Sequence, residues 1–162
     1  MKKIVQVSVL AVTAMVVMAT PAFAQSPKKL VVSQPVEVES ETLSQIVSPL
    51  IGVKYIHGGN SVKGFDASGF TQYVMSKQDI KVPRTTDGQR ELGETINKQS
   101  DMQEGDLVFF KNSEEDSKGA HVGIALGENK VALVTTTKGV TIIDVQQNKY
   151  WSKHFVEAKR IK

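Results

Sequence analysis

Two short stretches of the sequence carry residues with the types and spacing of a reactive centre. They are "GFDASGF", residues 64–70, and "AHVGI", residues 120–124. The first has the form of a loop that runs into a helix, with Asp66 as the N-terminal cap. A side chain just after this cap would lie at the positive end of the helix dipole, where a nucleophile is activated. That residue is Ala67, which has no reactive group, whereas His121 is a candidate base.

The absence of cysteine from the chain limits its chemistry. It excludes a disulfide, a thiol nucleophile, a thiolate metal ligand and a lipid-anchored cysteine. Ser68 is a poor substitute nucleophile, because one step along a helix turns its side chain about 100° away from that of Ala67 and a hydroxyl needs a stronger base arrangement than His121 alone. The three histidines are scattered and lack metal-ligand spacing. We therefore predict no metal and no cofactor.

Two helices are predicted ahead of the sheet. In residues 40–52, "SETLSQIVSPLIG", apolar residues recur at helical spacing behind Ser40 or Thr42 as a cap. Pro49 removes a backbone donor there, so we expect a short or kinked helix. The second helix is predicted within residues 65–80, with Asp66 as its cap and an apolar face toward the core. A loop with a short helical turn is expected at residues 82–93.

Apolar or alternating runs fill the second half of the chain. They are separated by glycine, asparagine and charged clusters, which is typical of an antiparallel sheet, and they cover residues 105–111, 120–127, 130–136, 139–145 and 154–161. Helices followed by strands predict an α+β domain, in which the helices pack on one side of a single sheet.

The N-terminal residues have the pattern of a secretory signal. Lys2 and Lys3 precede an apolar run that ends in "AFA", residues 22–24. A membrane anchor is the weaker alternative, because the run is shorter than the roughly 20 residues that span a bilayer. We predict a signal peptide at residues 1–24, a flexible leader at 25–39 and one domain at 40–162, with no membrane attachment after cleavage.

Charge argues against one class of partner. The whole chain has 20 basic and 17 acidic residues, and without residues 1–24 the numbers are 18 and 17. Nucleic-acid binding driven by net charge is therefore not expected. The remaining chain has the size of one domain that buries its own core, and we expect a monomer.

Four motifs in this order resemble the NlpC-type family of bacterial peptidoglycan endopeptidases, papain-like cysteine peptidases of the cell wall. The motifs are "YIHGGNSVKGFDASGF" from Tyr55, "VPRTTDGQ" from Val82, "EGDLVFFKNSEEDSKGAHVGIALG" from Glu104 and "YWSKHFVEAKRI" from Tyr150. The resemblance covers nearly all of residues 52–161. It implies a papain-like core, with N-terminal helices packed on a five- to six-stranded antiparallel sheet. It also implies a secreted protein of the cell wall or periplasm, with peptidoglycan stem peptides as partners.

The resemblance implies a role for particular residues. Family members carry Asp-Cys-Ser-Gly at a helix start, a histidine in His-Val-Gly-Ile and a third polar residue on the following strand. Ala67 then stands at the position of the nucleophile and His121 at that of the base. Val134 stands at the third position, or Thr135 if the register is shifted by one. The resemblance further implies that the substrate is bound by Tyr55, Asp66 and Ser68.

Two of the three catalytic positions thus lack suitable chemistry. We expect a catalytically inactive domain that binds stem peptides. One alternative is an active cysteine endopeptidase, hydrolysing γ-D-glutamyl–diamino acid bonds, whose cysteine at position 67 has been engineered to alanine. Another is a protein-interaction module that has lost the cleft, which would show as a filled pocket between Ala67 and His121. His57 is expected in packing or at the surface, and His154 facing solvent.

Overall fold

The computed structural model describes residues 41–112 and 120–161. The predicted signal peptide and leader lie outside these residues. The described residues belong to one compact unit, Val38–Lys162. Its elements in chain order are α1 (Leu43–Val47), η1 (Ser48–Leu50), β1 (Asn60–Ser61), β2 (Gly64–Phe65), α2 (Ala67–Ser76), α3 (Thr86–Arg90), β3 (Glu94–Ile96), η2 (Gln99–Asp101), β4 (Leu107–Phe110), β5 (His121–Ala125), β6 (Lys130–Thr135), β7 (Gly139–Asp144), α4 (Lys149–His154) and β8 (Phe155–Arg160).

The first helix is short, as Pro49 predicts. Thr42 caps α1 in a capping box: its hydroxyl accepts from the Gln45 N–H, and the Gln45 side chain accepts from the Thr42 N–H at 2.8 Å. The α-helix ends at Val47, and Pro49 lies in the 3-10 turn η1 that follows. The missing proline N–H therefore costs no α-helical hydrogen bond.

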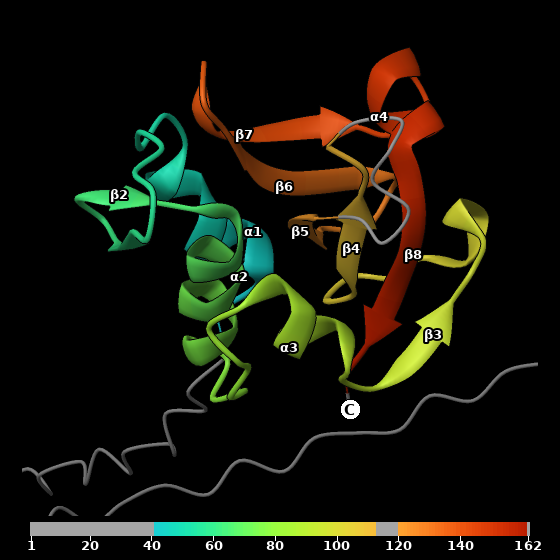
Figure 1. The fold of residues 1–162 in the computed structure, drawn as a ribbon, viewed down its shortest axis with the longest axis horizontal. Coiled ribbons are helices and arrows are strands. Elements are labelled where there is room, and N and C mark those ends of the chain that lie inside the picture. Colours follow the sequence, from blue (N-terminus) through green and yellow to red (C-terminus); the bar gives the residue numbers. More distant parts are fainter. Residues whose placement is uncertain (1–40, 113–119, 162) are drawn as a thin grey trace, which may run out of the picture. The chain divides into compact units, whose positions relative to one another are not determined.

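Helix α2 forms the centre of the helical layer. Its N-cap is Asp66, whose Oδ1 accepts from the Gly69 N–H at 2.7 Å. Phe70, Val74 and Met75 are buried on its inner face. This face packs against β5 and β6, and α1 lies beside α2 on the same side of the sheet (Figure 1). The predicted cap and apolar face are confirmed.

The main sheet has six antiparallel strands in the order β3-β8-β4-β5-β6-β7. This confirms the predicted α+β class. The sequence patterns predicted five of these strands and missed β3, a three-residue strand with one buried side chain, Ile96. The short hairpin of β1 and β2 and the helix α4 were also not predicted.

Both faces of the sheet are covered near its centre. All four residues of β4 are buried. Leu107 and Phe109 belong to the apolar cluster shared with α1 and α2, whereas Val108 and Phe110 belong to a second cluster on the other face. Trp151 of α4 packs against this second cluster. Within the described ranges, no helix has the length and apolar character needed to cross a bilayer.

Candidate active site

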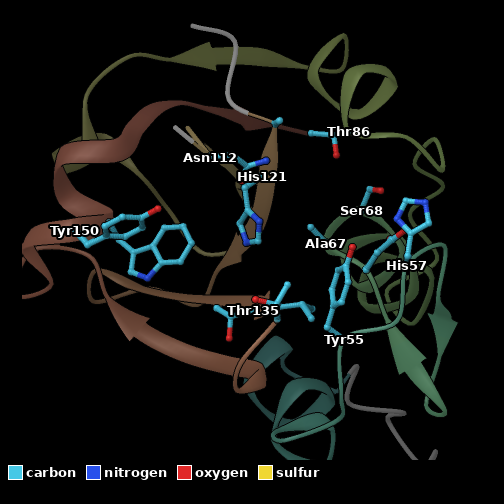
Figure 2. A pocket seen from close by; sticks show the side chains of 14 residues that line it. Tyr55, His57, Ala67, Ser68, Thr86, Asn112, His121, Thr135 and Tyr150 are labelled. Atoms are coloured by element: carbon cyan, nitrogen blue, oxygen red, sulfur yellow. The ribbon is translucent and has the colours of Figure 1, made fainter. Parts of the chain in front are cut away.

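A pocket of about 570 Å³ opens at the N-terminus of α2. All seven residues that the sequence singled out line it: Tyr55, Asp66, Ala67, Ser68, His121, Val134 and Thr135. Figure 2 shows Tyr55, His57 and Ser68 on one side of the pocket, and Tyr150 on the other beyond His121. The pocket between Ala67 and His121 is therefore not filled, unlike in a module that has lost its cleft.

Asp66 is the centre of a polar network at the base of α2. Besides capping Gly69, its carboxylate accepts from the Gly58 N–H at 3.1 Å. Arg84 donates to the same carboxylate at 2.6 Å and to the Ser68 hydroxyl at 3.0 Å. These contacts join the loop before β1, the helix start and the segment before α3. Both Asp66 and Ser68 thus have structural partners within the site.

Gln89 fixes the same segment from inside the protein. Its side chain is fully buried and donates to the backbone carbonyls of Ser68 at 2.9 Å and Pro83 at 2.8 Å. It also accepts from the Thr71 hydroxyl at 2.7 Å. Sequence reasoning missed Arg84 and Gln89 as supporting residues, although both lie in or next to the motif "VPRTTDGQ".

His121 lies at the start of β5 in a nearly dry environment. Burial lowers the pKa of its imidazole from 6.5 to about 4, so the ring is neutral near pH 7. Its Nε2 atom is buried and has no hydrogen-bond partner among the described residues. The ring packs against the indole of Trp151, with centroids 5.2 Å apart and planes 35° apart. The sequence gave no reason to place Trp151 beside His121, because α4 was not predicted.

The third catalytic position holds no group that could orient this imidazole. Val134 is buried within β6, opposite Val140 of β7. Thr135 lines the pocket, and its hydroxyl accepts from the Lys138 N–H at 3.0 Å. Neither side chain bonds to His121 within the part of the chain that the structure describes. The orientation of the ring therefore rests on packing against Trp151.

The other two histidines occupy different surroundings. His57 is exposed and lines the pocket. The expectation of a solvent-facing His154 is wrong, because only 8% of this residue is exposed. Its Nδ1 donates to the Tyr150 carbonyl at 2.7 Å, and its ring stacks on that of Tyr150 at 4.1 Å. The unpredicted helix α4 creates both contacts by placing the two residues one turn apart.

The chemistry of the pocket is that of a binding site. It offers hydroxyls, a carboxylate, a neutral imidazole and the N-terminus of α2. Position 67 supplies no nucleophile, since alanine has no polar side-chain atom. Residues 41–112 and 120–161 contain no cluster of three or more side chains fit to hold a metal ion.

Comparison with known families gives one match over most of the chain. A model described as "NlpC/P60 family" matches residues 52–160. A probable endopeptidase NlpC homolog of Haemophilus influenzae is 37% identical over 122 residues, which are 75% of this chain and 62% of that protein. The murein DD-endopeptidase MepS/murein LD-carboxypeptidase of Escherichia coli K12 is 38% identical over 127 residues, 78% of this chain and 64% of that protein.

A third relative, the gamma-DL-glutamyl hydrolase of Bacillus subtilis, is 36% identical over 76% of this chain and 31% of its own length. The chain thus spans about a third to two thirds of these relatives. Among solved structures, the NlpC/p60 domain of the peptidoglycan hydrolase SagA superposes with a TM-score of 0.63 at 27% identity, covering 76% of this chain and all of that domain. An NLP/P60 protein of Staphylococcus aureus gives a TM-score of 0.61 at 28% identity, covering 80% of this chain and 45% of that protein.

Proposed function

The chain belongs to the NlpC/P60 family, and on this basis we propose that it binds peptidoglycan stem peptides in the Ala67–His121 pocket without cleaving them. The observation that carries the proposal is an open pocket of about 570 Å³ with Ala67 at the start of α2. A cysteine peptidase needs a thiolate at such a position. The chain contains no cysteine to supply one.

The loss of the nucleophile leaves the binding groups in place. The first N–H groups of a helix have no partner within the helix and attract carboxylates. A stem peptide carries several carboxylates, and Ala67 and Ser68 bring the first turn of α2 to the pocket wall. Neutral His121 and the Tyr55 side chain line the same space. Binding of this kind does not depend on a sulfur atom.

We place this function outside the cytoplasm. The predicted signal at residues 1–24 would direct the chain to the cell wall or periplasm, and the relatives above include proteins named as murein and peptidoglycan hydrolases. The mature chain is proposed to act as a monomer without metal, cofactor or nucleic acid.

Two measurements on the secreted protein test the proposal. Incubation with purified peptidoglycan, followed by chromatography of the soluble products, should release nothing above a buffer control. Titration calorimetry with the tripeptide L-alanyl-γ-D-glutamyl-diaminopimelate should show weak binding. Turnover that resists thiol reagents and disappears in His121→Ala would refute the proposal, and so would the absence of binding at millimolar tripeptide.

A pair of variants locates the peptide. Ala67→Phe should abolish binding, because the phenyl ring occupies the pocket at the start of α2. Ser76→Phe places the same ring at the exposed far end of the same helix and should leave the dissociation constant unchanged. Equal effects of the two substitutions would place the peptide elsewhere.

A further inference from the structure

A second pocket of about 550 Å³ adjoins the first. It lies between the turn that joins β6 to β7, the strand β7 itself and the start of α4. Thr135 and Trp151 line both pockets. A ligand seated in the first pocket can therefore extend past these two side chains into the second. The volume lies within the range of roughly 300–1,000 Å³ that is usual for small-molecule sites.

Neutral hydrogen-bonding groups dominate the lining of this second pocket. Thr137 and Thr141 contribute hydroxyls, and Gln147 and Asn148 contribute amides. Within residues 41–112 and 120–161, the hydroxyls of Thr137 and Thr141 and the side-chain amide of Gln147 have no hydrogen-bond partner. Each of these groups can both donate and accept. The pocket thus holds unused capacity for a ligand rich in hydroxyl or amide groups.

An aromatic and aliphatic surface lies beside these polar groups. Asn148 caps α4 by accepting from the Tyr150 and Trp151 N–H groups at 3.2 and 3.3 Å. This cap places Trp151 at the mouth of the helix, between the two pockets. Ile143 packs against the same cluster as Trp151 and also lines the second pocket. Flat apolar surface next to hydroxyl and amide groups suits a pyranose ring, which has apolar C–H faces and a polar edge.

The charge of the lining distinguishes a sugar from more peptide. The second pocket carries one lysine, Lys138, and one aspartate, Asp144. The Asp144 carboxylate already accepts from the Gln146 and Gln147 N–H groups at 3.0 and 3.1 Å. A stem peptide would bring further carboxylates to a lining of balanced charge. An N-acetylated sugar is neutral and needs only the partners that are present.

We propose that the second pocket is a subsite for a neutral N-acetylated sugar ring of the glycan, attached to the peptide that occupies the first pocket. This inference rests on the proposed function. It assigns the preferred ligand as a glycan-attached peptide, rather than a free peptide. Trp151 and Thr135 then contact the junction between the sugar and the peptide.

Calorimetry with two probes tests the subsite. The first is the free tripeptide, and the second is the same tripeptide linked to N-acetylglucosaminyl-N-acetylmuramic acid. Two new hydrogen bonds and a covered ring face should make the second probe bind about tenfold more tightly, since each hydrogen bond is worth about 1 kcal/mol. Gln147→Ala and Thr141→Val should each reduce this advantage severalfold without changing binding of the free tripeptide. Gln146→Ala, an exposed neighbour outside the lining, is the matched control and should change neither constant.

The outcomes separate this inference from the proposed function. Equal affinity for the two probes would overturn the sugar subsite and leave peptide binding intact. Binding of the disaccharide-linked probe alone would support the subsite and refute recognition of the peptide. Failure of both probes to bind would overturn both proposals. An equal loss of the sugar advantage in Gln146→Ala and Gln147→Ala would show that the sugar binds outside this pocket.

Discussion

The buried imidazole of His121 predicts that acid destabilises the protein in a defined window. The folded-state pKa of this group is lowered to about 4 from 6.5 by burial. Between these values the unfolded chain binds a proton that the folded chain does not. Stability is therefore fully present above about pH 6.5 and falls as the pH drops toward 4.

The size of the effect follows from the shift. A difference of about 2.5 pKa units corresponds to about 3 kcal/mol between pH 7.5 and pH values below 4. At pH 5 the loss from this one group should be about 2 kcal/mol. This is a large fraction of the roughly 5–15 kcal/mol by which domains are usually stable.

His121→Gln removes the titrating group while keeping a polar side chain. The free energy of unfolding should be measured by urea denaturation at several pH values from 4.5 to 7.5 for the variant and the original protein. The variant should lose about 2 kcal/mol less than the original protein between pH 7.5 and pH 5. His57→Gln, at an exposed histidine of the same pocket, is the control and should follow the original profile. If the His121→Gln and original profiles are parallel, the imidazole is not desolvated as described.

Three other substitutions test the architecture of the site. Ala67→Cys should give a thiol whose pKa, measured from the pH dependence of alkylation, lies below the roughly 8.5 of free cysteine, because it stands at a helix N-terminus. Peptidase activity of this variant should stay low and rise when Thr135→His is added; equal activity with and without that change would refute a need for an orienting group. Arg84→Met should lower the free energy of unfolding by about 1 kcal/mol, since the ion pair that it breaks is partly exposed, while the exposed Lys81→Met should be neutral. Gln89→Leu should cost about 2–4 kcal/mol by leaving buried carbonyls and a hydroxyl without partners, and a loss below 1 kcal/mol would contradict the hydrogen bonds assigned to it.

The parts of the fold that the sequence predicts are those with local signals. Thr42 and Asp66 are capping residues just before apolar helical patterns, and Pro49 marks where the first helix must change. The strands of the second half are apolar runs bounded by turn residues. β3 was missed because only Ile96 of its three residues is buried, so the strand depends on pairing with β8 rather than on its own pattern.

The candidate site was predictable where a motif carries it. Ala67 and His121 follow from short motifs, and the structure brings both to one pocket. The partners of these residues are set by tertiary contacts that no local pattern encodes. Arg84 reaches Asp66 across 18 positions of sequence, and Trp151 meets His121 from the other end of the domain. The burial that lowers the pKa of His121 arises in the same way and is not visible in the sequence around it.

The position of Trp151 between the two pockets has a practical consequence. It is the chain's one tryptophan, and its indole touches the imidazole of His121 as well as the space beyond Thr135. Indole emission depends on local polarity and on contact with neighbouring groups. The unlabelled protein therefore contains its own optical probe. Filling the first pocket, filling the second and protonating the imidazole should each alter the emission of this single fluorophore, without a contribution from a distant tryptophan.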